Sequence, residues 1–183
     1  MKTIVLFIAF ILLTSGINAQ KFMTKNGYIG FYSHTPIEDI KGDNNQVASI
    51  LDVATGEIVF QVLMKSFKFE KALMEEHFNE NYVESEKIPK STFKGKIVNL
   101  SDINFSKPGV YKATVEGELS IHGITKNISE PGEIEITADG LSARSKFIIV
   151  PEDYNIEIPG IMREHIAKEI TVTVDVKMTP MAK

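Results

Sequence analysis

One helical segment interrupts a chain whose other regular structure alternates with a period of two. Residues 67–96 (FKFEKALMEEHFNENYVESEKIPKSTFKGK) read as a strand, a short helix, a proline-marked link and a second strand. The helix carries Met74, Phe78 and Tyr82 at i, i+4 and i+8. With Leu73 beside them, they make one narrow face apolar, while the other face is acidic. A single amphipathic helix within a long β-meander is typical of a closed or nearly closed barrel with a helical plug.

Strand-like alternation fills most of the remaining chain and is clearest in three segments. Over residues 111–121 the odd positions are apolar or small and the even positions are polar, which places one face in a core and the other in water. Residues 166–178 repeat this pattern. Residues 58–65 are partly apolar on both faces, so we expect their outer side to be covered. Weaker strands are predicted at residues 28–33, 47–53, 93–100, 128–137 and 141–150.

Short turns separate these strands. Residues 54–56, 123–126 and 139–140 are turn sequences short enough for hairpins, and residues 106–109 form a plain turn. Pro131 marks an edge position or a bulge, because proline cannot donate a ladder hydrogen bond. Short connections favour antiparallel neighbours, so the predicted fold class is all-β and antiparallel, with about eight strands and one inserted short helix. A two-layer sandwich would alternate in the same way, so periodicity leaves barrel closure open.

The first 19 residues have the features of a secretory signal peptide. Lys2 supplies a positive charge, residues 4–13 are continuously apolar, and residues 14–19 end in an A-x-A-like site, so we expect cleavage before Gln20. An apolar run of about ten residues is shorter than the ~20 that a membrane-spanning helix needs, and an uncleaved anchor is the alternative. We predict one mature domain over residues 20–183, periplasmic or secreted, without a stable membrane anchor.

Cysteine is absent from all 183 residues. This excludes disulfides, thiolate catalysis, cysteine-ligated zinc and lipidation of a cysteine after the signal peptide. The chain carries 20 Lys and Arg residues against 24 Asp and Glu residues, a net charge of −4. A mildly acidic surface without a basic cluster argues against nucleic acid as a partner. The sequence leaves open whether the protein is a monomer or a homodimer.

Candidate catalytic and metal-binding residues are few. The histidines, His34, His77, His122 and His165, are widely spaced and form no H-x-H or H-x₃-H pair, so we predict no metal site. Ser33 and His34 point to opposite faces of a strand and cannot share a proton. The chain lacks a G-x-S-x-G elbow and a glycine-rich phosphate loop. We therefore expect neither an enzyme nor a cofactor. His122 lies beside a turn, where we expect it to hydrogen-bond a backbone carbonyl.

Three blocks of the sequence resemble the YceI-like lipid-binding proteins of bacteria. Residues 27–34 (GYIGFYSH) resemble the opening strand of that family, and residues 74–95 (MEEHFNENYVESEKIPKSTFKG) its helix, link and following strand. Residues 117–126 (GELSIHGITK) resemble its G-x-L-T-I-x-G-V-T-K hairpin. With the closing strand, the likeness covers essentially all of the mature chain. The Arg-Asp pair that precedes the helix histidine in many members is replaced here by Glu75-Glu76, so no anion contact is carried over.

The resemblance implies a lipocalin-like antiparallel β-barrel that holds a polyisoprenoid or another long-chain amphiphile inside. It brings no catalytic residues. Each CH₂ group moved from water into such a lumen contributes about 0.8 kcal/mol, so ten methylene groups supply roughly 8 kcal/mol before ordering costs. We predict an exported carrier or sequestering protein for a long-chain apolar lipid. The alternative is an exported β-protein without a ligand, acting through protein contacts or in envelope stress.

Large apolar side chains are the candidate ligand contacts, because lipid pockets are mostly apolar. They are Phe31, Phe60, Phe67, Phe78, Tyr82, Phe93, Tyr111, Val115, Leu119 and Phe147. The same residues would fill a solid core, so the sequence leaves open whether the barrel is hollow. Gly117 lies on the face of Val115 and Leu119, and we expect it to leave space in the lumen. Polar candidates for head-group contacts at the mouth are His34, His77, Asn79 and Arg144.

Overall fold

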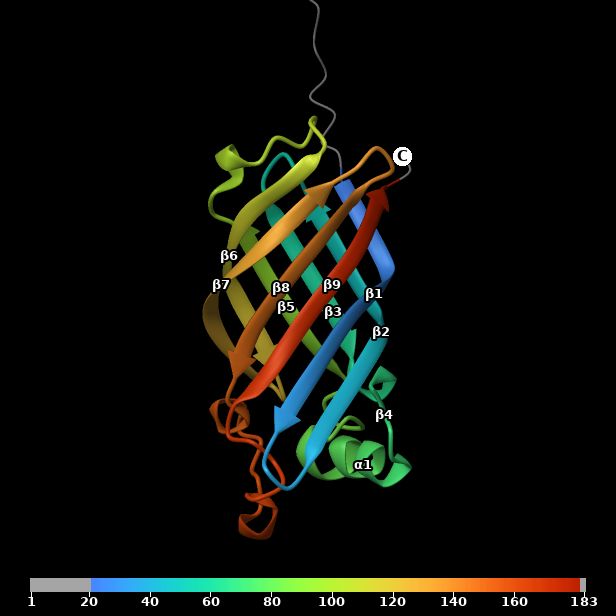
Figure 1. The fold of residues 1–183 in the computed structure, drawn as a ribbon, viewed down its shortest axis with the longest axis vertical. Coiled ribbons are helices and arrows are strands. Elements are labelled where there is room, and N and C mark those ends of the chain that lie inside the picture. Colours follow the sequence, from blue (N-terminus) through green and yellow to red (C-terminus); the bar gives the residue numbers. More distant parts are fainter. Residues whose placement is uncertain (1–20, 182–183) are drawn as a thin grey trace, which may run out of the picture.

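The computed structural model describes residues 21–181, and the predicted signal peptide, residues 1–19, lies outside this range. Eight long strands form an antiparallel barrel with a short helix near one end (Figure 1). The barrel strands are β1 (Lys21–His34), β2 (Asp39–Asp52), β3 (Glu57–Leu63), β5 (Lys90–Ile97), β6 (Gly109–Ile121), β7 (Ile124–Ile136), β8 (Leu141–Ile149) and β9 (Ile170–Pro180).

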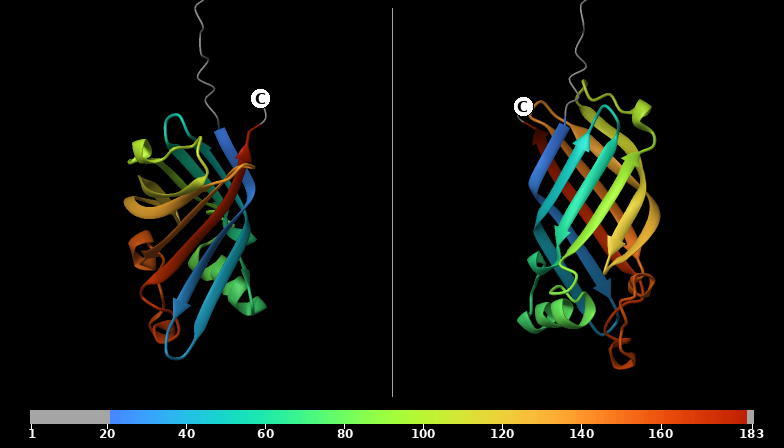
Figure 2. Two further views of the ribbon diagram at one scale, coloured as in Figure 1. Left: turned by 45° about the horizontal axis from the view of Figure 1, so that its top comes forward. Right: turned by 180° about the vertical axis from the view of Figure 1, so that it is seen from behind.

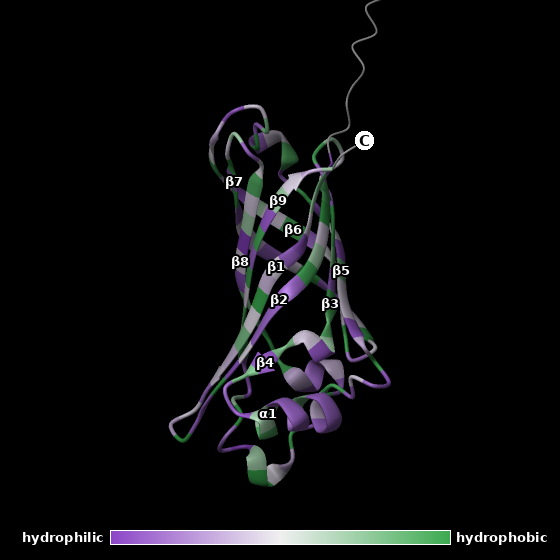
Figure 3. Cartoon of the chain, turned by 90° about the vertical axis from the view of Figure 1, so that its right-hand side faces the viewer, coloured by the Kyte–Doolittle hydropathy of each residue, from purple (hydrophilic) through white to green (hydrophobic). Residues whose placement is uncertain are grey.

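Barrel closure follows from the pairing of the first strand. β1 pairs with β2 on one side and with β9 on the other, and the remaining strands pair in the order β2-β3-β5-β6-β7-β8-β9. Figure 2 shows the closed wall from two further sides. Hydropathy alternates along the strands, as one dry and one wet face require (Figure 3). The predicted all-β antiparallel barrel is therefore confirmed, and the two-layer sandwich is excluded.

The helical insertion lies between β3 and β5. A 3₁₀ turn, η1 (Met64–Ser66), leads to the two-residue strand β4 (Lys68–Phe69), which pairs with β2 beyond the end of β3. The helix α1 (Ala72–His77) follows and continues into η2 (Phe78–Tyr82), which is wound as a π-helix. The predicted order of strand, helix, link and strand is therefore confirmed.

The apolar face of this helix is narrower than predicted. Met74, Phe78 and Tyr82 face the barrel interior. Leu73 is 60% exposed and faces solvent, so its predicted place beside them is wrong. Successive residues of a helix are about 100° apart around its axis, which takes Leu73 out of a face defined by Met74.

Two strand predictions also need correction. β9 begins at Ile170 rather than at Ile166, because the Ile166 N–H closes a turn onto the carbonyl oxygen of Met162 at 2.9 Å. The outer side of β3 is not covered. Val59 and Leu63 on that side are 41% and 38% exposed, so apolar character on both faces of a strand did not indicate burial on both.

The hairpin between β6 and β7 turns through His122 and Gly123, one residue earlier than predicted. Their φ angles are 50° and 77°, the pair of positive values that a two-residue type I′ turn requires. The His122 ring forms a hydrogen bond with the carbonyl oxygen of Tyr154 at 3.2 Å, a backbone carbonyl as expected, but one 32 residues away from the turn. This contact joins the hairpin to η4 (Pro151–Tyr154), a 3₁₀ turn that follows β8.

One half of the barrel, at the end where β1 begins and β9 ends, is a solid core. Its fully or nearly fully buried apolar side chains come from β2, β7, β8 and β9 and lie outside the cavity described below. They are Val47, Leu51, Ile136, Leu141, Val176 and Met178. The other half, next to α1, contains the candidate site.

Candidate functional site

A cavity of about 300 Å³ extends from the helical insertion toward the middle of the barrel. All eight barrel strands contribute inward-facing side chains to its lining, and nearly all of these are apolar. Ligand pockets commonly measure about 300–1,000 Å³, so the cavity is large enough for a small or slender molecule. The barrel is thus filled in one half and hollow in the other, a question that alternation alone left open.

Nine of the ten predicted ligand contacts line this cavity. They are Phe31, Phe60, Phe67, Phe78, Tyr82, Phe93, Val115, Leu119 and Phe147. Tyr111 lies outside the lining, and its hydroxyl donates to the carbonyl oxygen of Lys107 at 3.0 Å, in the loop before β6. We therefore exclude Tyr111 from the proposed ligand contacts.

Gly117 does not leave space in the lumen. It is the register partner of Gly95 on β5, and a Cβ atom at Gly117 would lie 2.3 Å from the backbone oxygen of Lys94. The two glycines instead allow the backbones of β5 and β6 to approach closely at this register position. The prediction of free volume at this position was wrong, because a missing side chain in a strand can be filled by neighbouring backbone.

Phe78 packs the helical insertion against the barrel. Its ring centroid lies 5.1 Å from that of Phe69 and 5.4 Å from those of Phe31 and Phe67. Phe31 also contacts Phe67 and Phe69, at 5.4 and 5.7 Å. Pairs of this kind contribute about 0.5–1.5 kcal/mol beyond their burial. These four rings, the phenylalanine cluster, close one side of the hollow end.

Residues 150–169, between β8 and β9, cover the rest of the hollow end and were missed as site residues. Ile156, Ile158, Met162 and Ile166 of this segment line the cavity, and the first two are buried. The segment is mostly irregular, with only short 3₁₀ turns. Its sequence therefore has no period that could predict which side chains point inward.

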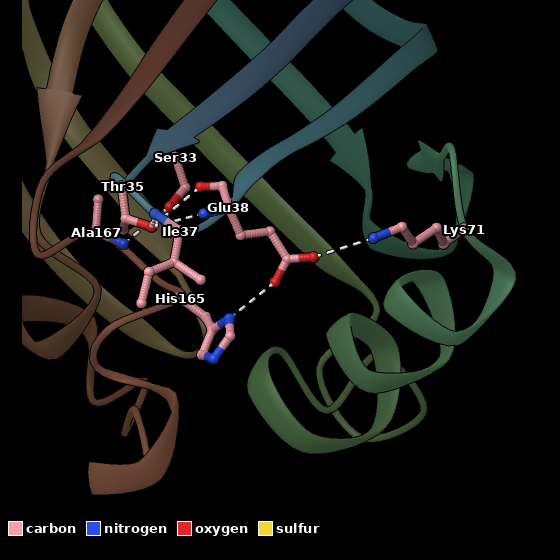
Figure 4. A network of polar contacts seen from close by, with 7 residues as sticks. All are labelled: Ser33, Thr35, Ile37, Glu38, Lys71, His165 and Ala167. Carbon is pink, nitrogen blue, oxygen red and sulfur yellow. Dashed lines mark hydrogen bonds and ion pairs between the residues drawn. The ribbon is translucent and has the colours of Figure 1, made fainter.

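Glu38 connects the two coverings of the hollow end (Figure 4). Its carboxylate accepts a hydrogen bond from Lys71 Nζ at 3.1 Å, beside α1, and lies 3.2 Å from His165 Nδ1 in residues 150–169. The Glu38 N–H donates to Thr35 Oγ1 at 3.0 Å, which fixes the tight β1–β2 loop. The hydrogen bond from Lys71 is the main reason that the pKa of Glu38 is lowered, with His165 adding to it. One carboxylate thus joins three segments.

Two of the four polar residues predicted at the mouth are at the cavity. His77 and Arg144 line it. His34 pairs instead with Asp39 at 2.5 Å, with two-thirds of its side chain exposed. Asn79 donates to a backbone carbonyl of its own helix at 2.8 Å. Neither of these two residues lines the cavity.

An acidic side chain inside the lumen was also missed. Glu130 shares the inner face of β7 with Ile128, Gly132 and Ile134, and all four line the cavity. Burial raises the pKa of Glu130, and no hydrogen bond or ion pair within residues 21–181 offsets this effect. Alternation across the predicted strand at residues 128–137 was a signal that could have placed this carboxyl group inside.

Over residues 21–181, no three His, Cys, Asp or Glu side chains gather in a way that could hold a metal ion. No helix in that range is both long and apolar enough to cross a bilayer.

Solved structures share this fold at low sequence identity. A polyisoprenoid-binding domain from Saccharophagus degradans, implicated in plant cell wall breakdown, matches with a TM-score of 0.76 at 12% identity, over 89% of this chain and 99% of that one. BcnA from Burkholderia cenocepacia matches with a TM-score of 0.69 at 14% identity, over 84% and 96%. A YCEI protein from Campylobacter jejuni matches with a TM-score of 0.61 at 18% identity, over 82% and 90%.

The sequence comparison agrees with the resemblance noted above. None of the curated proteins matches the chain. Residues 21–178 match the YceI-like domain, which spans the whole barrel from β1 to β9. The chain therefore belongs to the YceI-like domain family.

Proposed function

We propose that this protein is an exported, non-enzymatic carrier or sequestering protein for a long-chain apolar lipid, such as a polyisoprenoid or a similar amphiphile. The observation that carries the proposal is the apolar cavity in one half of a barrel whose other half is solidly packed. Family membership and the polyisoprenoid-binding domain of Saccharophagus degradans, which has the same fold, support this class of ligand.

The lining favours recognition of a lipid tail by desolvation and shape. Phe60 and Phe93 stand beside branched aliphatic side chains, and few polar atoms reach the lumen. A tail of about ten methylene groups would gain roughly 8 kcal/mol on leaving water, from which its ordering cost is subtracted. Such a gain needs no hydrogen bond to the tail, so selection among lipids would depend on tail length and on the head group.

The alternative of a ligand-free protein carries an energetic cost. Empty cavity volume destabilises a core by about 24 cal/mol per Å³, so a dry lumen of about 300 Å³ would cost roughly 7 kcal/mol. The total stability of a domain is typically about 5–15 kcal/mol. A lipid in the lumen would recover much of that loss, which favours the carrier over a protein that acts only through protein contacts.

Native mass spectrometry of protein isolated without detergent tests the proposal. We expect a hydrophobic adduct on the wild-type protein. Ala113→Leu, which places a larger side chain in the cavity lining, should reduce adduct occupancy with little loss of stability, whereas overpacking a solid core costs about 1–3 kcal/mol. Lys112→Leu, at the exposed neighbouring position, is the matched control and should retain the adduct. A wild-type protein without an adduct, or an Ala113→Leu protein with full occupancy, would contradict the proposal.

A further inference from the structure

The barrel wall splits between β7 and β8. The two strands pair over only five positions, from Ile136 with Leu141 to Gly132 with Ser145. Beyond Ser145, β8 continues along β9, while the first half of β7 follows β6 (Figure 1). Within residues 21–181, the facing edges of the two strands therefore have no strand partner over the hollow half of the barrel.

Fixed contacts bound this split at both ends. Toward the filled half, Ser145 Oγ donates to the carbonyl oxygen of Pro131 at 2.7 Å. Toward the covered end, Lys126 Nζ lies 3.0 Å from an Asp153 carboxylate oxygen and 5.8 Å above the ring of Tyr154. The split is therefore a side window with defined edges rather than a frayed end of the sheet.

The cavity reaches the side window. Its lining includes Ile128 and Phe147 from the inner faces of the two separated strands. The lining also includes Glu133 and Arg144, register partners that point outward just above the split. Because Ile128 and Phe147 lie where the two strands no longer pair, the cavity lies directly behind the split.

Glu130 stands on the inner rim of the side window, two residues before the last β7–β8 pair. Two of the nearby cations are engaged elsewhere. Lys126 pairs with Asp153, and Arg144 is held by Glu135 at 3.0 Å and by Asp175 at 3.5 Å. Within residues 21–181, the Glu130 carboxylate thus faces an apolar lumen with its hydrogen-bonding capacity unused.

We propose that the side window is an entrance to the lumen and that Glu130 receives a lipid head group that donates hydrogen bonds, such as a hydroxyl or an amine. This inference rests on the proposed lipid-binding function. The tail would extend along the apolar lining, and entry would leave the phenylalanine cluster and the Glu38 contacts in place. A carboxylate or phosphate head group is disfavoured, because its negative charge would lie close to the Glu130 carboxylate at a site where water screens the repulsion poorly.

Binding of three ten-carbon lipids that differ only in their head group tests this inference. The alcohol, the amine and the carboxylate are titrated into lipid-free protein at pH 8, well above the ordinary pKa of a glutamate. Hydrogen bonds to charged groups change affinity by about tenfold or more, so the wild-type protein should prefer the alcohol and the amine over the carboxylate by at least roughly tenfold. Glu130→Gln should reduce this preference to less than about threefold, because the like charge is removed. Glu118→Gln, an exposed position on the outer face of β6 and outside the cavity lining, should leave it unchanged.

The outcomes separate this inference from the proposed function. Equal affinity of the wild-type protein for the three lipids, or an undiminished preference in a Glu130→Gln protein of normal melting temperature, would overturn the role of Glu130. Failure of the wild-type protein to bind any of the three lipids would overturn the proposed function itself, and this inference with it.

Discussion

Truncation of Phe78 is the sharpest test of how the helical insertion is held. Phe78→Ala removes a ring that contacts Phe31, Phe67 and Phe69 at centroid distances of 5.1–5.4 Å. Deleting a fully buried phenylalanine costs about 3–5 kcal/mol. Because Phe78 is only half-buried, we expect a loss of about 3 kcal/mol, at the low end of that range. In a domain of this size, that loss lowers the melting temperature by roughly 6–12 °C.

Thermal and urea unfolding measure this effect, with Leu73→Ala as the matched control on the same helix. Leu73 is 60% exposed, so its truncation should change stability by no more than about 0.5 kcal/mol. Phe78→Ala should also lose bound lipid, because the phenylalanine cluster closes one side of the cavity. Equal melting temperatures for the wild-type and Phe78→Ala proteins would refute the structural role, and loss of lipid alone would identify the helix as a mobile lid.

Three further predictions concern the barrel wall, the Glu38 contacts and export. Gly117→Leu should lower the free energy of unfolding measured in urea, because its Cβ atom would lie 2.3 Å from the backbone of β5. Gly160→Leu is the control and should leave stability unchanged, since a Cβ atom there would have nothing within 4 Å. Equal stabilities of the two variants would contradict the close approach of β5 and β6. Because the pKa of Glu38 is lowered in the folded protein, its ionised carboxylate stabilises the fold at pH values above 4.5, the ordinary pKa of the group. This contribution is lost as the pH falls through the folded-state pKa. Melting temperatures of wild-type and Glu38→Gln proteins should therefore differ at neutral pH and converge in acid, and a gap that persists at low pH would argue against the ion pairs. N-terminal sequencing of the exported protein should start at Gln20, and a retained initiator methionine would contradict cleavage.

Alternation predicted which strand side chains face inward, but not how deep in the barrel they lie. Tyr111 and Val115 share one face of β6, yet only Val115 lines the cavity. Depth along the barrel depends on pairing with strands distant in sequence, and on side chains such as Met178 that fill the other half. The hollow half is therefore a non-local property that no single strand encodes.

The covering of the site was harder to predict than its wall. Alternation along β7 was sufficient to place the carboxyl group of Glu130 inside the barrel. The side window could not be predicted in this way, because it depends on where β7–β8 pairing stops and on contacts such as that of Ser145 with Pro131. Residues 150–169 are mostly irregular, so their inward-facing side chains follow no period. The Glu38 contacts join segments up to 127 positions apart, so no local sequence pattern could predict them.

The central claim is that half of this barrel holds a lipid tail. A crystal structure of protein purified from the exporting cell without detergent or delipidation tests it most directly. We predict elongated density that runs from Phe78 past Phe60 and Phe93 to the middle of the barrel, beside the side window. We predict no such density among Val47, Leu51 and Met178, whose side chains already fill the other half. A lumen that the protein's own side chains close, or one that holds only ordered water, would contradict the account.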